Sequence, residues 1–331
     1  MAPSISGTPA GPAIGAGTWA WGNQFLWGYG PQQDPQLQAC FQRAIALGLT
    51  LFDTADSYGT GRYAGRSESL LGQFCAALPA EQRQRLTVAT KLAPFPWRLG
   101  RSGFLRAFEA SRQRLQGKLD RVQLHWSTAR YLPWQEQPLL EGLADLVQQG
   151  QVAELGVSNM GPQRLRRLHA HLADRGVKLC SVQVQLSLLA TDPIAAGGVA
   201  SVCRELGIDL IGYSPLALGL LAQAPGQEPP RWSGPRALLL RHLWPRLQPL
   251  LEAQAAIAES HDSTPAAVAL NWCRAHGAMP IPGLRRVDQA EAAAAALHWT
   301  LDPAEREELD RLALGCRAAG VAMPANPFLS D

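Results

Sequence analysis

The sequence predicts an α/β fold in which eight parallel strands close into a (β/α)8 barrel of the TIM type. Short apolar segments alternate with amphipathic segments of helical length through nearly all of the 331 residues. Such alternation indicates a parallel sheet covered by helices. Eight strand-helix units favour a closed barrel. The other candidate, an open doubly wound sheet, would need a glycine-rich first crossover that the sequence lacks.

The predicted elements follow one another along the chain. The strands are expected at 14–18, 50–53, 86–91, 122–126, 153–158, 179–184, 209–213 and 280–282. The helices are expected at 36–47, 67–77, 103–115, 138–149, 162–174, 194–206, 264–276 and 287–297. The first strand contains Gly15 and Gly17, but the sixth residue of a GxGxxG fingerprint would be Ala20, so a dinucleotide-binding crossover is not predicted there.

Composition limits the partners that the chain could bind. With 47% hydrophobic and 17% charged residues, the chain is long enough for one large or two ordinary domains with a substantial core. The eight-unit repeat favours one barrel domain over residues 1–331. The formal charge of +3 is too small to indicate nucleic-acid or membrane binding. Six dispersed cysteines without a CxxC pair fit reduced thiols better than disulfides, and no metal site is predicted.

Two further segments bear on compartment and function. Residues 1–13 lack the basic and apolar regions of a secretory signal, and no apolar run is long enough to span a membrane. The cytoplasm is therefore expected, with an organelle reached through a transit peptide absent from this sequence as the alternative for a plant protein. The connection at 217–248 is too long for an ordinary loop, and its Pro/Gly-rich part, 225–236, is typical of a lid or binding loop.

Polar residues stand at the ends of three successive predicted strands. Asp53 and Tyr58 follow Leu51 and Phe52, Lys91 ends the next strand, and His125 lies at the end of the one after it. Lys91 lies 33 residues after Tyr58, and His125 lies 34 residues after Lys91. Because the carboxyl ends of barrel strands carry the active site, these four side chains are expected to meet at the mouth of the barrel.

In this order the four residues resemble the catalytic tetrad of the aldo/keto reductase family, which consists of Asp, Tyr, Lys and His. Four later motifs extend the resemblance over nearly the whole chain: GVSN at 156–159, VQVQ at 182–185, YSPL at 213–216 and PIPG at 280–283. The resemblance implies a barrel that reduces carbonyl compounds with NADPH. It also implies that 217–248 folds over the cofactor and that the irregular tail, 315–331, closes one side of the substrate pocket, although a frayed terminus would look similar.

The tetrad makes chemical sense as a coupled set. A free phenol has a pKa of about 10, and a nearby ammonium lowers it, so Lys91 is expected to make Tyr58 a better proton donor. Asp53 would keep the buried Lys91 charged. We therefore expect Tyr58 to act as the general acid in reduction, while a neutral His125 donates a hydrogen bond to the carbonyl oxygen.

No residue in this set can transfer a hydride, so a reduced cofactor is required. The resemblance implies nicotinamide and pyrophosphate contacts at Ser158, Asn159, Gln183, Tyr213, Ser214, Pro215 and Leu216. The first three would contact the carboxamide, the tyrosine would stack on the nicotinamide ring, and the last three would pass the pyrophosphate.

Preference for NADPH over NADH is expected from the segment after the last strand. Arg285 and Arg286 follow Gly283 and precede a predicted helix, where guanidinium groups and helix N-terminal amides could bind a 2′-phosphate. Two solvated arginines at a helix start would give the same pattern. Gln289 fits the family, whereas alanines at 292–293 replace a Glu-Asn pair that usually contacts adenine.

Four tryptophans, Trp19, Trp21, Trp97 and Trp126, follow strand ends and predict an aromatic substrate pocket. Segments such as LFDTADSYGTGR and GVSNMGPQ resemble a branch of the family in plant plastids and cyanobacteria that reduces pyridoxal to pyridoxine. The partner is therefore expected to be a small aldehyde. A broad-specificity aldehyde reductase and a cofactor-sensing subunit like the potassium-channel β subunits remain alternatives, and the oligomeric state is not predicted.

Overall fold

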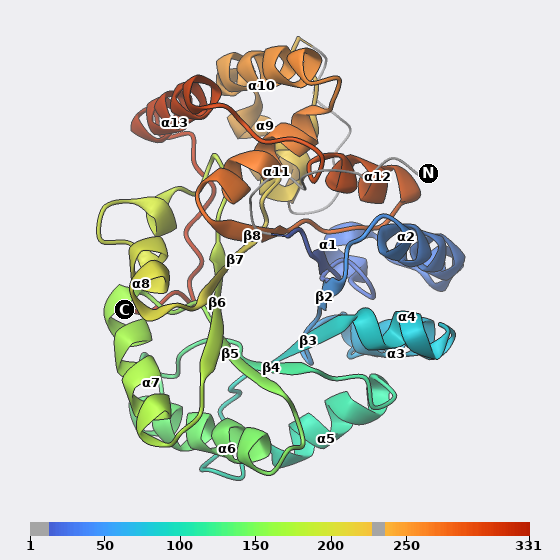
Figure 1. Ribbon diagram of the computed structural model, residues 1–331, viewed down its shortest axis with the longest axis vertical. Coiled ribbons are helices and arrows are strands. Elements are labelled where there is room, and N and C mark those ends of the chain that lie inside the picture. The colour runs from blue at the N-terminus through green and yellow to red at the C-terminus, as the bar shows by residue number, and fades with distance from the viewer. Residues whose placement is uncertain (1–12, 227–235) are drawn as a thin grey trace, which may run out of the picture.

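The computed structural model describes residues 13–226 and 236–331, and their strands form one eight-stranded parallel sheet in chain order (Figure 1). The strands are β1 (Ala16–Gly17), β2 (Leu51–Asp53), β3 (Thr87–Leu92), β4 (Arg121–Leu124), β5 (Glu154–Ser158), β6 (Leu179–Gln185), β7 (Asp209–Tyr213) and β8 (Ala278–Ile281). The amides of Gly15 and Gly17 donate to the carbonyl oxygens of Pro280 (3.0 Å) and Pro282 (2.8 Å), so β1 meets the end of β8. The predicted (β/α)8 barrel is confirmed.

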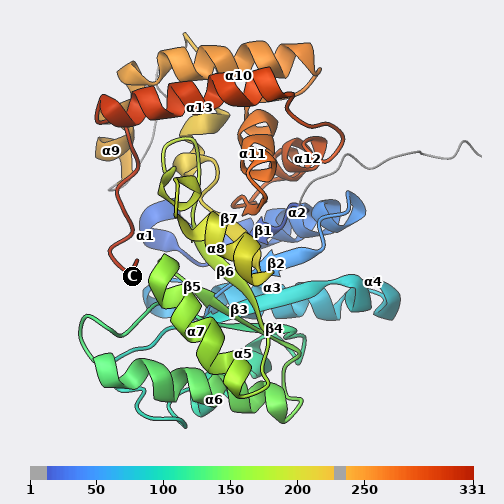
Figure 2. The same ribbon diagram turned by 60° about the vertical axis from the view of Figure 1, so that its left-hand side comes forward.

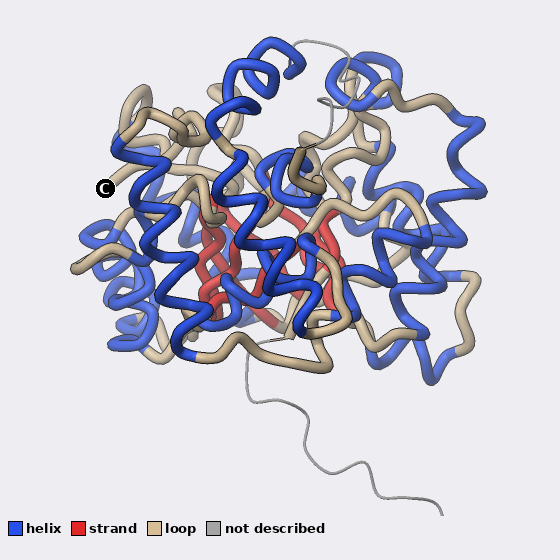
Figure 3. Tube along the Cα trace, turned by 90° about the horizontal axis from the view of Figure 1, so that it is seen from above, coloured by secondary structure: helices blue, strands red, loops and turns tan. Residues whose placement is uncertain are grey.

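Helices surround the strands on all sides (Figure 3). Those that follow the strands in the barrel repeat are α2 (Asp34–Ala46), α3 (Arg66–Ala76), α5 (Leu105–Arg114), α6 (Glu136–Gln148), α7 (Pro162–Asp174), α8 (Val199–Leu206), α11 (Pro265–Ala275) and α12 (Val287–Ala295). The others are α1 (Gln24–Trp27), α4 (Ala80–Arg85), α9 (Arg236–Leu243), α10 (Gln248–Ser260) and α13 (Pro303–Ala318). A continuous apolar core fills the space between strands and helices.

None of the helices outside the repeat was predicted, and α10 and α13 are the longest of them. α10 and α13 pack side by side over α11, away from the strands (Figures 1 and 2). A capping box begins α13, because the Asp302 side chain accepts from the amide of Glu305 (2.8 Å) and the Glu305 side chain accepts from that of Asp302 (2.9 Å). The tail expected to be irregular from residue 315 is therefore helical to Ala318.

Two other sequence-based boundaries need correction. The helix expected at 194–206 begins only at Val199, since a 3₁₀ turn at Asp192–Ile194 is followed by Gly197 in the left-handed region (φ 72°). The connection expected at 217–248 contains a 3₁₀ segment at Ala217–Ala222 and helix α9. Most of its Pro/Gly-rich part, 227–235, lies outside the described residues.

Buried hydroxyl groups join β1, β2 and α3 beneath the barrel mouth. Thr18 Oγ1 donates to the Asp53 carbonyl (2.9 Å), and Ser67 Oγ lies 2.7 Å from Thr18 Oγ1 and 2.9 Å from Thr54 Oγ1. These bonds fix the end of β2, which carries Asp53. In the described part of the chain, no helix has the length and apolar character needed to cross a bilayer.

Candidate active site

The barrel mouth contains a buried ion pair between neighbouring strands. Asp53 ends β2 and Lys91 lies in β3, and their side chains, each 2% exposed, form the pair. Lys91 Nζ also donates to the Thr54 carbonyl (2.7 Å). The other carboxylate oxygen of Asp53 accepts hydrogen bonds from Gln123 Nε2 (3.0 Å) and Gln183 Nε2 (2.9 Å). A buried ion pair of this kind is stable only when its other donors and acceptors also form hydrogen bonds, as those of Lys91 and Asp53 do here.

Lys91 also lies against the phenol of Tyr58. Its Nζ is 4.8 Å from the centre of the Tyr58 ring. Burial lowers the pKa of Lys91, but the charges of Asp53 and Tyr58 and hydrogen bonds to both outweigh burial and leave that pKa raised. The ammonium is therefore charged at neutral pH.

The pKa of Tyr58 is raised above its ordinary value of about 10. Burial is the largest cause, the charge of Lys91 lowers the pKa, and the charge of Asp53 raises it again. Lys91 thus acts in the predicted direction, but desolvation of the phenolate outweighs it. Tyr58 consequently holds its proton at neutral pH.

His125 follows β4 and lies beside the phenol. Its ring centre is 6.0 Å from that of Tyr58, in an edge-to-face arrangement. Burial, and secondarily the positive charge of Lys91, hold the pKa of His125 well below 6.5. Its imidazole is therefore neutral, and Nδ1 lies 3.3 Å from Ser57 Oγ. The structure brings Asp53, Tyr58, Lys91 and His125 together.

A second polar cluster lies at the ends of β5 and β7. Asn159, in the left-handed region (φ 60°), donates through Nδ2 to the His125 carbonyl (3.0 Å). Its Oδ1 accepts from Tyr213 OH (2.9 Å) and from Asn326 Nδ2 (3.0 Å). Ser158 Oγ donates to the Gln183 carbonyl (3.1 Å). Asn326 was not singled out in the sequence, where nothing distinguishes it from other tail residues.

The turn after β7 has unusual backbone conformations. Ser214 (φ 53°), Ala217 (φ 46°) and Leu218 (φ 58°) all occupy the left-handed region although none is glycine. Pro215 and Leu216 lie between them. Each such residue costs about 1–3 kcal/mol, and strained segments of this kind cluster at ligand-binding sites.

The segment after β8 is arranged differently from the sequence-based expectation. Arg285 Cζ lies 4.8 Å above the ring centre of Trp27, and Arg286 forms an ion pair with Asp288 (2.7 Å). Gln289 Oε1 accepts from the amides of Arg285 (2.9 Å) and Arg286 (3.2 Å), where α12 begins. The two guanidinium groups therefore have separate partners. The backbone amides that were expected to face a phosphate donate instead to the side chain of Gln289. A Cβ on Gly283 would meet nothing within 4 Å, so the backbone is open there.

The four tryptophans occupy different environments. Trp126 lies against His125 (ring centres 4.8 Å apart) and stacks on Phe328 of the tail (4.4 Å). Trp97, 72% exposed, stacks on Phe95, whose ring also contacts Trp126.

The other two tryptophans belong to the segment after β1. Trp19 packs edge-to-face on Trp27. Trp21 is 1% exposed, packs on Phe74 and donates to the Leu284 carbonyl (2.7 Å). Trp21 is thus part of the core, and its prediction as a pocket residue is wrong, because sequence alone does not distinguish a core tryptophan from a pocket tryptophan.

The tail after α13 is bound to the barrel at several points. Arg130 donates to the carbonyls of Pro327 (2.6 Å) and Leu329 (2.9 Å), and the Gly161 amide donates to the Ser330 carbonyl (2.7 Å). Asp331 Oδ1 accepts from the amide of Gln163 (2.7 Å) in the first turn of α7, which has no side-chain cap of its own. The tail is therefore docked over the mouth beside Trp126.

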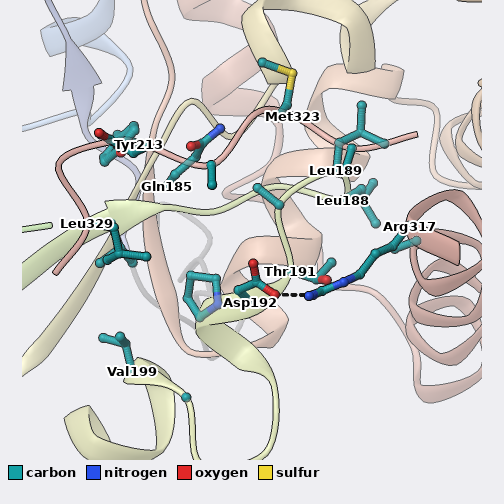
Figure 4. A pocket seen from close by; sticks show the side chains of 18 of the residues that line it. Gln185, Leu188, Leu189, Thr191, Asp192, Val199, Tyr213, Arg317, Met323 and Leu329 are labelled. Carbon is teal, nitrogen blue, oxygen red and sulfur yellow. Dashed lines mark hydrogen bonds and ion pairs between the residues drawn. The ribbon is translucent and has the colours of Figure 1, made fainter. Parts of the chain in front are cut away.

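A cavity of about 270 Å³ separates this tail from the segment after β6 (Figure 4). An ion pair between Arg317 and Asp192 forms part of its wall, together with apolar side chains such as Leu188. Asn159 and Tyr213 also line the cavity, and none of Asp53, Tyr58, Lys91 and His125 does. It adjoins the second polar cluster and is separate from the ion pair at the mouth.

Comparison with known proteins matches the sequence to a family. The model of the aldo/keto reductase family matches residues 13–314. The chloroplastic pyridoxal reductase of Arabidopsis thaliana is 48% identical over 302 residues, covering 90% of this chain and 82% of that protein. An uncharacterized oxidoreductase of Mycobacterium tuberculosis is 35% identical over 330 residues, covering 96% and 93%.

Solved structures agree with the barrel. An aldo-keto reductase from Klebsiella pneumoniae in complex with NADPH has a TM-score of 0.71 and 26% identity, and the match covers 97% of this chain and 95% of that one. The thermostable aldo-keto reductase Tm1743, in complex with the inhibitor epalrestat, has a TM-score of 0.72 and 25% identity over 91% of this chain and 95% of that one.

Proposed function

The chain belongs to the aldo/keto reductase family, and from this premise we propose that it uses NADPH to reduce an aldehyde, with pyridoxal, reduced to pyridoxine, as the substrate. One observation carries the proposal: a charged lysine, held by a buried aspartate, lies against a protonated phenol at the barrel mouth. A neutral imidazole lies beside the same phenol. This arrangement supports proton donation to a carbonyl oxygen.

The residues of the second polar cluster fit a nicotinamide. Asn159 Oδ1 and Tyr213 OH already bind a primary amide, that of Asn326, which has the same donor chemistry as a carboxamide. We assign the carboxamide contacts to Ser158, Asn159 and Gln183, and the ring contact to Tyr213. When bound, NADPH would supply the hydride.

The proton is the protein's contribution. Tyr58, protonated at neutral pH, gives its hydroxyl proton to the carbonyl oxygen as charge develops there. Lys91 stabilises the phenolate that remains, because its ammonium lies against the same ring. His125, neutral, donates a hydrogen bond to the carbonyl oxygen and shares its developing charge.

The phenol assignment is tested by Tyr58→Phe, which removes the donor and keeps the ring. Reduction should fall by about 10²–10⁴-fold while NADPH affinity, measured by fluorescence titration, stays unchanged. Substantial remaining activity would contradict the assignment. If the unmodified protein binds NADPH tightly but turns over no aldehyde in a broad panel, the cofactor-sensing alternative replaces the reductase.

Pyridoxal is supported by the 48% identity to a pyridoxal reductase and by the aromatic side chains around the mouth. A flat heteroaromatic aldehyde would suit the stacked rings of Trp126 and Phe328. Steady-state kinetics should give a kcat/KM for pyridoxal well above that for 4-nitrobenzaldehyde. Equal values would instead favour a broad-specificity aldehyde reductase.

The cofactor preference is proposed to depend on Arg285, whose guanidinium is oriented by Trp27. Arg285→Ala should raise the KM for NADPH much more than the KM for NADH. Arg286→Ala is the matched comparison, because Arg286 is engaged by Asp288. If Arg285→Ala changes the KM for both cofactors equally, Arg285 does not bind the 2′-phosphate.

We further propose that the strained turn, Ser214, Pro215 and Leu216, binds the pyrophosphate and that 217–248 covers the cofactor.

We also propose that residues 1–331 form one domain and that the protein works in a reducing compartment such as the cytoplasm. All six cysteines are free thiols, and burial raises the pKa of several, including Cys40 and Cys75, to about 12. Unreactive, reduced thiols are typical of such compartments. Cell fractionation would test the assignment.

A further inference from the structure

One side chain that the proposed mechanism does not use touches the ring of His125. Ser57 Oγ lies 3.3 Å from Nδ1 of the imidazole. A neutral imidazole has one N–H donor and one acceptor nitrogen, and the hydrogen bond at one nitrogen decides which nitrogen carries the proton. Ser57 is therefore placed to select the tautomer of His125.

The chemistry of the pair favours one direction for this hydrogen bond. An imidazole nitrogen is a stronger base than a hydroxyl oxygen, so O–H donation to Nδ1 gives the better bond. Within the described residues, Ser57 Oγ makes no other hydrogen bond, so its proton is not committed elsewhere. With Nδ1 as the acceptor, the proton of the neutral ring lies on Nε2.

The position of Ser57 is fixed by its neighbours in the turn after β2. The Asp56 amide donates to the Lys91 carbonyl (3.0 Å), and the Tyr58 amide donates to the Ala55 carbonyl (3.1 Å). The Asp56 carboxylate accepts from the Ala93 amide (3.1 Å) and pairs with Arg98 (2.5 Å). The turn is thus tied to the end of β3 through Asp56 and closed on itself by the Tyr58 amide, so the backbone is held on both sides of Ser57 while its hydroxyl faces the imidazole.

Other groups around the ring leave the far nitrogen available. Tyr58 faces the ring edge-on, Trp126 packs at 4.8 Å, and the charge of Lys91 opposes protonation. In the part of the chain that the structure describes, Nε2 of His125 has no hydrogen-bond partner. An N–H at Nε2 is free to meet a carbonyl oxygen.

We propose that Ser57 is a positioning residue that holds His125 in the tautomer protonated on Nε2, so that the imidazole presents a donor to the substrate carbonyl. This inference rests on the proposed reductase function for its consequence in catalysis. The tautomer itself is a property of the protein without substrate. The two statements can therefore be tested separately.

The direct test is ¹⁵N NMR of the imidazole nitrogens in the full-length protein, with the His125 signals identified by their loss in His125→Gln. The spectrum of the unmodified protein should show Nδ1 as the unprotonated nitrogen and Nε2 as the protonated one. Ser57→Ala should give a mixture of tautomers, and Ser57→Thr, which keeps the hydroxyl, should restore the original pattern. A proton on Nδ1, or an unchanged pattern in Ser57→Ala, would overturn the proposal.

Kinetics provide the second readout. Ser57→Ala should lower kcat for aldehyde reduction by about 3- to 10-fold, the range expected for one neutral hydrogen bond, without changing the KM for NADPH. Ser69→Ala is the matched control, because the Ser69 hydroxyl lies in α3 and donates to the carbonyl of Gly65, the residue just before that helix. A decrease of the same size in Ser69→Ala would contradict a specific role for Ser57. If no aldehyde is reduced, the reductase proposal fails, and the spectra still decide the role of Ser57.

Discussion

The buried pair of Asp53 and Lys91 predicts that losing one charge destabilises the protein more than losing both. Lys91→Met leaves a carboxylate that is 2% exposed with two amide donors and no cation. Removing one partner of a buried pair typically costs about 3–5 kcal/mol, whereas replacing both is often close to neutral. The double variant Asp53→Asn/Lys91→Met should therefore recover most of the stability lost in Lys91→Met.

Recovery is expected because the amides that bind Asp53 keep an acceptor. Gln123 and Gln183 both donate to the same carboxylate oxygen, and the Asp53→Asn side chain retains one carbonyl oxygen in that position. The methionine of Lys91→Met fills the volume of the lysine stem with apolar atoms. The buried charges are then gone, and the groups that lose Lys91 as a partner, the Thr54 carbonyl and the side-chain NH2 of Asp53→Asn, are neutral and cost less to leave unpaired than a carboxylate.

Urea unfolding followed by circular dichroism would give the free energy of unfolding of each variant. Lys178→Met, at an exposed lysine, is the control and should change stability by less than about 0.5 kcal/mol. Both Lys91 variants should reduce aldehydes at least about 10²-fold more slowly, because Tyr58 loses its cationic neighbour. A double variant as unstable as Lys91→Met would refute the coupling between the two charges.

Three further predictions concern the surroundings of the site. Burial raises the pKa of Asp56 to about 6, so the folded state binds a proton there more tightly than the unfolded chain does. Relative to Asp56→Asn, the free energy of unfolding of the unmodified protein should therefore rise by about 1–3 kcal/mol as pH falls from about 7.5 to about 4.5. A difference between the two proteins in urea unfolding that does not change with pH would refute this. Glu68→Ala should lower the free energy of unfolding by about 3–5 kcal/mol, because Glu68 is fully buried and binds Arg114 (2.6 Å). Glu109→Ala on the surface should lower it by less than about 0.5 kcal/mol, and similar losses in the two variants would contradict the role of burial. Asn326→Ala removes the tail amide that occupies the proposed carboxamide contacts. NADPH binding, measured by fluorescence titration, should become up to about tenfold tighter. Weaker binding would instead make Asn326 a cofactor ligand.

The sequence contained enough information for the barrel because its repeat is periodic. Each strand-helix unit carries its own alternation of apolar and amphipathic segments, so eight units could be recognised one at a time. Helices α10 and α13 were missed because neither alternates with a strand, although the capping box of Asp302 and Glu305 marks the start of α13. Helix boundaries near glycines, such as the start of α8 after Gly197, depend on local backbone conformation that composition does not specify.

The candidate site was predictable only as far as topology places residues at strand ends. Asp53, Lys91 and His125 met because the carboxyl ends of parallel strands share one rim. Asn326 reaches Asn159 across 167 residues of sequence, and no local pattern indicates such a contact. The contact of Ser57 with His125 likewise depends on how the turn after β2 folds over the mouth.

Burial gives the groups at the mouth different protonation states, and the proposed reduction requires this difference. Desolvation alone would neutralise Lys91, but Asp53 keeps it cationic. Desolvation also raises the pKa of Tyr58 and keeps its phenol protonated, and the charge of Lys91 only makes this increase in pKa smaller. His125 is neutral because burial and the ammonium act in the same direction. Before the proposed reaction the four groups therefore sum to zero charge, and the proton of Tyr58 would leave from beside the ammonium of Lys91, which would stabilise the resulting phenolate. In the proposed mechanism Asp53 thus contributes to proton transfer through Lys91, as a residue that fixes a charge rather than one that touches the substrate.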